Sequence, residues 1–471
     1  MHKNHKIKVI FIMNEIKQNQ IILFFLFLLI VLPANDNIHA QSNPILLMEI
    51  PSSPNIVGSG AKSLGMGGAF IAIADDATAA SWNPGALAQL TKPEISIVQS
   101  YAHRKYNYSF SNHPEASSAD SINELKLNYF SFAYPFINED YRYMIISLNY
   151  QHLYNFERNW NFQFNFTDPS FIGPVCYDFE QTGDLYALGL SFSTKKNENF
   201  FAGVTLNYWG DFIYQNKWEQ KYHETGSKIY PRPPDPGGTR SYYTLNVNKQ
   251  YFFKGWNLNL GFLLRINEKW KIGGVIKTPF KADIEQTVVI EYIQEYPTAP
   301  SSSTHNKGIS KIDSKLRMPL AYGFGLAYRY SSNFTISGDF YVTQWNDFEF
   351  ENRYGDRTSA ISGVKTNDST VDPTTWFRLG FEYILMGKDN KSILFPLRAG
   401  IFYDPAPSEG SPDDYYGLAF GTCITFNKQY IFDIAYQFRY GNNVDESIVP
   451  GGYFSQDVRE HKVFTSLIKY F

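Results

Sequence analysis

Large apolar side chains alternate with small or polar ones along most of this 471-residue chain, from about residue 94 to the end. Alternation with a period of two is typical of a β-strand that has one apolar face. Between residues 256 and 264 the even positions carry Trp, Leu or Phe, and the odd positions include Asn257, Asn259 and Gly261. In the segment 318–328 the even positions are again large and apolar, and Met318 is the first of them. Fourteen such segments lie near 94–106, 123–134, 141–154, 183–193, 199–210, 255–265, 269–279, 315–329, 333–344, 375–386, 392–404, 415–426, 429–440 and 460–471.

The connections between these segments alternate in length. Short links join strands two and three, four and five, and six and seven, and those at 330–332, 387–391 and 427–428 are equally short. The long connections are 107–122, 155–182, 211–254, 280–314, 345–374, 405–414 and 441–459. Short turns on one side and long loops on the other are typical of outer-membrane barrels. The pattern predicts an all-β fold, a fourteen-stranded antiparallel transmembrane β-barrel with both chain ends on the short-turn, periplasmic side.

Composition agrees with a barrel whose lipid-facing and lumen-facing residues alternate. Aromatic residues make up 17% of the chain, with 34 Tyr and 39 Phe, yet the mean hydropathy is −0.31. A net charge of −3 gives no reason to expect a nucleic-acid partner. Cys176 and Cys423 lie far apart, so we expect two free thiols and no disulfide.

The N-terminal region reads as an export signal. Ile21–Leu32 is an uninterrupted apolar run, too short to span a bilayer comfortably as a helix. Lysines precede it, and Ala40 supplies a small residue for cleavage. At the other end, the terminal Phe471 resembles the signal by which the barrel assembly machinery recognises outer-membrane proteins. We therefore expect a signal peptide at 1–40 and a place in the outer membrane of a Gram-negative bacterium.

A glycine- and alanine-rich stretch, Gly58–Leu90, precedes the first predicted strand. A fourteen-stranded barrel is too wide for its own side chains to fill. We therefore expect residues 41–93 to form a lumenal hatch with short helices, and 94–471 to form the barrel. Within the hatch, Asp75 or Asp76 is expected to cap a helix in Ala72–Ala80, which Pro84 ends. The glycine spacing fits neither a phosphate-binding loop nor a dinucleotide-binding motif.

This stretch resembles the N-terminal hatch of the FadL/TodX family of outer-membrane transporters for long-chain fatty acids and hydrocarbons. The resemblance lies in Gly60–Ala69, Ala74–Asp76 and Trp82–Pro84, and its hatch residues are Gly65, Gly67, Gly68, Asp75, Asp76, Asn83 and Pro84. Gly273–Glu285, Ile336–Glu349 and Leu397–Pro407 are similar to recurrent strand segments of the family. The resemblance implies a FadL-like barrel with a blocked lumen that takes up fatty acids or other hydrophobic small molecules.

Two features depart from the family pattern. Gly85 follows Asn83-Pro84 where the family often has alanine. The predicted third strand has no glycine or proline to mark the inward kink that forms the lateral exit in characterised members. Lateral release is therefore implied by the resemblance alone.

Several residues are candidates for ligand contact. Lys277, Arg378, Arg398 and Arg439 alternate with the large apolar residues of their strands, so we expect their side chains to face the lumen. Arg398 is our choice for the contact with a carboxylate head group. Glu382 and Asp433 share that parity, so a ladder of lumenal salt bridges is the alternative. Phe70, Ile71 and Ile73 of the hatch are candidate apolar contacts. The aromatic-rich segments Tyr154–Phe166 and Asn207–Trp218 form either a surface groove or loops packed above the rim.

Catalysis is not expected. Neither His-Glu-x-x-His nor Gly-x-Ser-x-Gly occurs, and no metal or cofactor is predicted. The expected partners are a long-chain fatty acid or other hydrophobic small molecule, outer-membrane lipid and the assembly machinery, with a monomeric barrel. An alternative from a different functional class stays open. Some FadL-like barrels that resemble PorV act in type IX protein secretion or surface attachment, and they share the glycine-rich and Asn-Pro hatch features.

Overall fold

The computed structural model describes residues 57–137, 143–165, 173–232, 235–386, 394–427, 429–444 and 454–471. The predicted signal peptide and residues 41–56 of the predicted hatch lie outside these ranges. None of the helices in the described ranges is long and apolar enough to cross a membrane.

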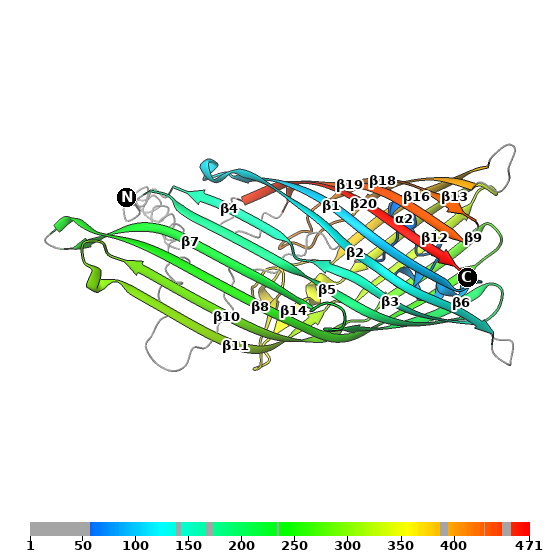
Figure 1. Cartoon of the computed structure of the whole chain (residues 1–471), viewed down its shortest axis with the longest axis horizontal. Coiled ribbons are helices and arrows are strands. Elements are labelled where there is room, and N and C mark those ends of the chain that lie inside the picture. The colour runs from blue at the N-terminus through cyan, green and yellow to red at the C-terminus, as the bar shows by residue number, and fades with distance from the viewer. Residues whose placement is uncertain are drawn as a thin grey trace, which may run out of the picture.

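Fourteen antiparallel strands of the described chain close into a barrel (Figure 1), as the alternation predicts. Around the barrel they are β1 (Glu94–Phe110), β2 (Ser118–Ile137), β3 (Tyr143–Asn155), β5 (Val175–Lys195), β6 (Phe200–Trp209), β8 (Asp235–Arg265), β9 (Trp270–Lys277), β12 (Ala321–Arg329), β13 (Phe334–Thr343), β16 (Thr374–Met386), β17 (Leu394–Tyr403), β18 (Tyr416–Phe426), β19 (Tyr430–Val444) and β20 (Phe454–Tyr470). The last strand pairs with the first, with Tyr470 opposite Glu94. This pairing closes the sheet and removes its free edges at this level.

The predicted long loops 155–182, 211–254 and 280–314 are wrong, because they contain additional strands. They contain β4 (Arg158–Phe164), β7 (Lys217–Arg232), β10 (Phe280–Glu295), β11 (Thr304–Met318) and the first halves of β5 and β8. Figure 1 shows these strands extending far beyond the rest of the barrel on one side. The first half of β5 pairs with β4 and β7, whereas its second half pairs with β3 and β6. Pairing with neighbours satisfies backbone groups that would be free on isolated long strands.

The strand predicted near 315–329 is two strands. β11 ends at Met318 and β12 begins at Ala321, with Pro319 between them. Proline has no N–H to donate to a ladder, and it separates the two elements. Met318 was expected to face lipid, but it is only 4% exposed and packs in an aromatic cluster. The two short strands β14 (Glu349–Glu351) and β15 (Arg357–Ser359) continue the sheet from β11.

The predicted alternation holds in the part of the barrel nearest the short turns. On β8, Trp256 is 57% exposed, whereas Asn257 and Asn259 are buried towards the lumen. Aromatic pairs flank the exposed apolar band, with Tyr208 against Trp256 on one side and Trp270 against Tyr328 on the other. An apolar band between aromatic girdles is typical of a barrel in a bilayer.

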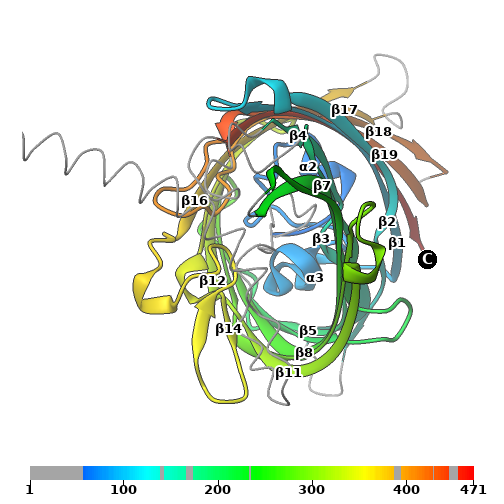
Figure 2. The same ribbon diagram turned by 90° about the vertical axis from the view of Figure 1, so that its left-hand side faces the viewer.

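Residues 57–90, the described part of the predicted hatch, lie inside the barrel, where Figure 2 shows their helices within the ring of strands; this segment is called the hatch below. It comprises α2 (Ala61–Gly65), α3 (Ala79–Trp82) and the 3-10 helix η1 (Pro84–Gln89). Four further 3-10 helices are η2 (Pro114–Ala116), η3 (Pro300–Ser302), η4 (Trp345–Asp347) and η5 (Thr366–Asp368).

The helix expected within Ala72–Ala80 is shorter and starts later. It begins at Ala79, with Thr78 as its N-cap, and no side chain caps it. The Asp76 carboxylate accepts the Thr78 N–H at 2.8 Å, which closes a turn before the helix. Asp75 makes no cap either, because it pairs with a lysine of α2. The helix ends at Trp82, before Pro84, as predicted.

Candidate functional site

The hatch backbone touches the barrel wall at a series of lumen-facing glycines. An added Cβ at Gly400 would lie 2.3 Å from the Gly67 nitrogen, and one at Gly273 would lie 2.5 Å from the Ile71 carbonyl oxygen. Both distances are too short for real carbon atoms, so only glycine allows the hatch to approach this closely. The wall glycines that contact the hatch are Gly203, Gly261, Gly273, Gly323, Gly325, Gly380, Gly400 and Gly421, on β6, β8, β9, β12, β16, β17 and β18.

The predicted hatch glycines face this wall. Gly65 packs on Gly421, where an added Cβ would lie 2.9 Å from the Gly421 Cα. Gly67 and Gly68 have φ angles of +66° and +79°, which disfavour any other residue. A side chain at Gly68 would also overlap the guanidinium of Arg378. These positions therefore need glycine for backbone conformation and for close approach.

Polar anchors fix the register of the hatch against the wall. The Asp339 carboxylate of β13 accepts the backbone N–H groups of Phe70 and Ile71 at 2.6 and 2.8 Å. The Asn83 amide donates to the carbonyl oxygens of Ile71 and Phe262 at 2.9 and 2.8 Å. These bonds satisfy backbone groups of a segment that is not paired in the sheet, so they position the hatch as well as hold it.

Asn83 and Pro84 also shape the turn into η1. The Asn83 Oδ1 accepts the Gly85 N–H at 3.1 Å, and Pro84 occupies the first turn of the 3-10 helix. A Cβ at Gly85 would lie 2.6 Å from the Gly261 carbonyl oxygen. The departure at this position from the family motif therefore has a local cause, which is close contact with β8.

The acidic pair of the hatch is divided between two partners. Asp75 forms an ion pair with Lys62 at 2.7 Å, which ties α2 to the turn before α3. Asp76 binds Thr78, and Glu94 at the start of β1 accepts the Ala77 N–H at 2.7 Å. These contacts are internal to the hatch or link it to the barrel.

Arg398, the predicted head-group contact, faces the lumen and is only 6% exposed. Its guanidinium lies between two carboxylates, with Nε 2.7 Å from Glu382 and Nη1 2.5 Å from Asp433. Arg378 and Arg439 both approach Asp404, at 3.7 and 3.3 Å. This arrangement matches the salt-bridge ladder that parity also allowed.

The remaining ligand candidates are buried where hatch and wall meet. Lys277 donates to the Val57 carbonyl oxygen at 2.7 Å. Phe70 and Ile71 are fully buried, Ile73 is 8% exposed, and Phe70 meets Trp82 edge-on at 6.0 Å between ring centroids. Ligand contact by these four candidates stays a prediction.

The barrel wall has a seam between β2 and β3. Their pairing ends at Tyr129 opposite Gln151, although both strands continue towards the end of the barrel away from the short turns. Irregularities flank this point, since the β1–β2 register shifts between Val98 and Gln99, and the β3–β5 register shifts between His152 and Tyr154. β3 therefore carries a bulge with no glycine or proline in it, and bulges bend strands.

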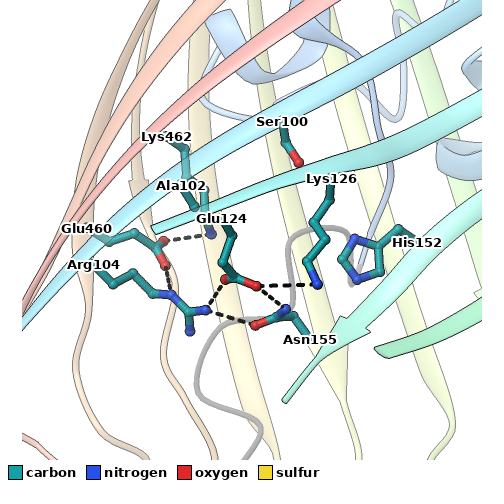
Figure 3. A pocket seen from close by; sticks show the side chains of 9 residues that line it. All are labelled: Ser100, Ala102, Arg104, Glu124, Lys126, His152, Asn155, Glu460 and Lys462. Carbon is teal, nitrogen blue, oxygen red and sulfur yellow. Dashed lines mark hydrogen bonds and ion pairs between the residues drawn. The ribbon is translucent and has the colours of Figure 1, made fainter. Parts of the chain in front are cut away.

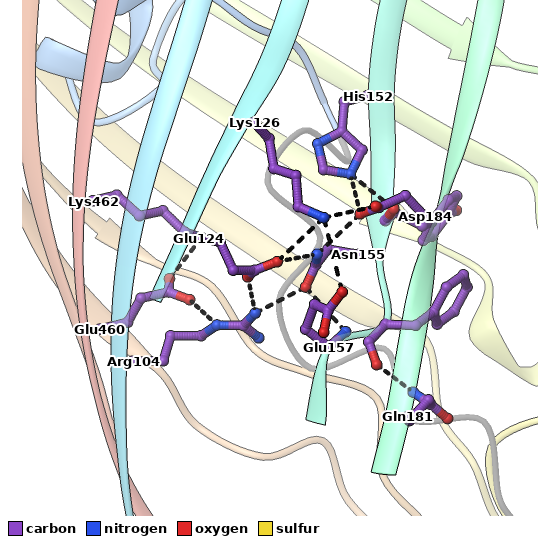
Figure 4. A network of polar contacts seen from close by, with 12 residues as sticks. Arg104, Glu124, Lys126, His152, Asn155, Glu157, Gln181, Asp184, Glu460 and Lys462 are labelled. Carbon is purple, nitrogen blue, oxygen red and sulfur yellow. Dashed lines mark hydrogen bonds and ion pairs between the residues drawn. The ribbon is translucent and has the colours of Figure 1, made fainter. Parts of the chain in front are cut away.

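Charged side chains bridge the seam (Figures 3 and 4). From β2, Lys126 reaches Asp184 of β5 at 2.7 Å, and His152 of β3 contacts the same carboxylate at 2.8 Å. Arg104 donates to Asn155 at 2.8 Å and also contacts Glu124. Arg104, Glu124, Lys126, His152 and Asn155 line a small pocket between β1, β2, β3 and β20. Side-chain contacts thus take the place of a backbone ladder here.

Two apolar clusters line the lumen above the hatch. The first contains Trp209 and Trp218 and lies nearer the hatch, and Trp218 stacks on Tyr251 with 4.6 Å between centroids. The second contains Phe162 and lies farther from the short turns. From the aromatic-rich segments predicted as groove or loops, Tyr154, Phe156, Phe162, Trp209 and Trp218 are buried in these two clusters. Three residues, Phe212, Ile213 and Tyr214, remain exposed on the outside.

No protein-family model matches the chain, and no curated protein matches it. Solved structures do. A FadL homologue from Pseudomonas aeruginosa superposes with a TM-score of 0.53 at 14% identity, covering 90% of this chain and 99% of that one. The chain has the fold of a FadL-type barrel. The P. putida toluene transporter TodX gives 0.54 at 14% identity, and the monoaromatic hydrocarbon channel CymD 0.51 at 14%, each covering 88% of this chain and 99% and 98% of theirs.

The sequence analysis did not predict Asp339 and Glu94 as anchors of the hatch. Both alternate with outward-facing residues of their strands, so the alternation alone indicates that they face the lumen. The residues at the seam could not be predicted in this way, because alternation along one strand does not determine where its pairing with the next strand ends.

Proposed function

We propose that this chain is an outer-membrane channel through which hydrophobic small molecules, long-chain fatty acids among them, enter the cell. The hatch, Gly58–Leu90, would block the lumen at rest. The observation that carries the proposal is the position of the hatch, clamped across the lumen beneath two apolar clusters in a barrel of FadL type. Apolar walls with few polar groups suit such ligands. The proposal includes a monomer that is surrounded by outer-membrane lipid and assembled by the barrel assembly machinery.

Within this proposal, the cargo leaves sideways through the seam between β2 and β3. The seam is supported as the exit because its strands have no shared ladder beyond Tyr129 and Gln151. The wall glycines that contact the hatch support the same exit, because they lie on β6 to β18, in the part of the barrel opposite the seam. Beside β1 and β2 the hatch is held by hydrogen bonds, among them Ser59 to Asn128 and Ala77 to Glu94, in place of close glycine contacts.

The test is uptake by Gram-negative cells that lack their own outer-membrane fatty-acid transporter. Cells that express this chain should accumulate radiolabelled oleate or toluene faster than cells with the empty vector. Equal rates for both ligands in both strains, with the barrel shown to be folded in the outer membrane, would reject the proposal.

Attachment of secreted proteins, the PorV-type role, is the second candidate, and one observation favours it. Within the described chain, the strand β11 pairs with β10 on one side, whereas on the other side only Lys315–Arg317 pair, with β14. Its outer part, which includes Ile309 at 68% exposure, presents a free edge to which a partner strand could add. If this role is correct, deleting the gene from its host should release surface proteins into the medium and leave oleate uptake unchanged.

A further inference from the structure

Lys249, on β8 in the extracellular extension, is a buried cation. It is 7% exposed, and it makes no ion pair or hydrogen bond to any residue of the described chain. Its neighbours across the two ladders are Gln220 of β7 and Val288 of β10, which are uncharged. Burial lowers the pKa of Lys249 to about 8, so the ammonium form persists at neutral pH. A buried charge without a counter-charge is costly, and an anion would relieve that cost.

The surroundings of Lys249 are apolar along the strand. On one side Leu245 and Val247 belong to the extracellular cluster, and on the other Tyr251 and Phe253 belong to the cluster nearer the hatch. Trp218 of β7 stacks nearly parallel on Tyr251, with 7° between the rings. Lys249 thus stands at the junction of two apolar surfaces, which is where the charged end of an amphipathic molecule would be neutralised.

The acidic residue of this wall has its own partners. Glu224 of β7 accepts hydrogen bonds from the hydroxyls of Tyr222 and Tyr243 at 2.7 and 2.9 Å. Burial raises the pKa of Glu224. It lies four residues beyond Gln220, the ladder partner of Lys249, and no contact joins it to Lys249. An internal salt bridge therefore does not explain the lysine.

We propose that Lys249 binds the carboxylate of a fatty acid or similar amphipathic acid, whose hydrocarbon part lies on the aromatic rings of β7 and β8. This inference rests on the proposed function and adds selectivity to it. A charge-assisted contact in a site from which water is largely excluded favours the acid over a neutral molecule of the same length.

The experiment compares dodecanoate with 1-dodecanol by equilibrium binding to the purified full-length barrel in amphipol at neutral pH. The variant is Lys249→Met, which keeps an unbranched, flexible side chain one atom shorter and removes its charge. The matched control is Lys254→Met, because Lys254 lies on the same strand with its side chain 58% exposed. We expect Lys249→Met to weaken dodecanoate binding by about tenfold or more while dodecanol changes less than about twofold, and the control to bind both like wild type.

Equal losses for both ligands would overturn the inference and assign Lys249 to packing, and so would no loss for either. If wild type binds neither ligand, the proposed function itself fails. If Lys249→Met does not fold, as judged by its mobility on unboiled gels, wild type alone gives the answer. Its dodecanoate affinity should fall as the pH rises through about 8, with dodecanol unaffected, and a flat dodecanoate profile would contradict the role of the lysine.

Discussion

The carboxylate of Asp339 accepts the backbone N–H of Phe70 at 2.6 Å, which joins the barrel wall to the middle of the hatch. The neighbouring Ile71 N–H binds the same oxygen at 2.8 Å. Hydrogen bonds to a charged acceptor are each worth about 1.5–3 kcal/mol. This single side chain is therefore a principal link between the strand scaffold and the segment proposed to move.

Replacing Asp339 should loosen the hatch without unfolding the barrel. Asp339→Ala leaves two buried N–H groups without an acceptor, so the hatch loses part of its docking energy. We expect larger and noisier single-channel conductance in planar bilayers. Asp313→Ala on exposed β11 is the control and should conduct like wild type. A quiet Asp339→Ala channel, identical to wild type, would mean that the anchor does not restrain the hatch.

Alanine at a wall glycine should separate the hatch from the wall. At Gly400 an added methyl has no room beside Gly67, and overpacking of this kind costs about 1–3 kcal/mol. We expect Gly400→Ala to lower the Tm of the purified barrel and to expose the hatch to protease. Gly308→Ala, where nothing lies within 4 Å, is the matched control. Equal Tm values for the two variants would show that the close approach is not needed.

Replacing Arg398 distinguishes a structural role in the salt-bridge ladder from a role in binding carboxylate head groups. Arg398→Met leaves Asp433 buried without its partner, which typically costs about 3–5 kcal/mol. If the arginine is structural, the variant unfolds at lower denaturant, and adding Glu382→Gln and Asp433→Asn restores stability. If it binds head groups as parity alone suggested, the restored triple variant still binds dodecanoate weakly and dodecanol normally. The two measurements are denaturant midpoints and binding titrations on the same preparations.

Much of the barrel followed from side-chain parity. Alternation located the wall strands, and it placed Arg398, Glu382 and Asp433 on the lumenal face where the structure has them. The glycines of Gly58–Leu90 indicated close packing, and their contacts with wall glycines such as Gly400 give the physical reason. In each case one face is buried and the other exposed, so the pattern carries the information.

The features that the sequence analysis did not predict lack this contrast between a buried and an exposed face. The first half of β8 carries Arg240, Asn246 and Asn248 among its tyrosines, so its polar residues resemble a loop. The apolar pattern continues across Pro319, which hid the break between β11 and β12. The seam depends on where β2 and β3 stop pairing, and register reflects partner strands more than local composition.

A reversible lock on the hatch tests the central claim most directly. Ser59 of the hatch donates its hydroxyl hydrogen bond to Asn128 of β2, on the side away from most of the glycine wall. A Ser59→Cys/Asn128→Cys pair, in a background with Cys176 and Cys423 replaced by serine, can join the two by a disulfide. Cells that carry the oxidised barrel should take up radiolabelled oleate at the background rate, and reductant should restore uptake to the level of the cysteine-free parent. Undiminished uptake with the disulfide fully formed would contradict a channel gated by its hatch.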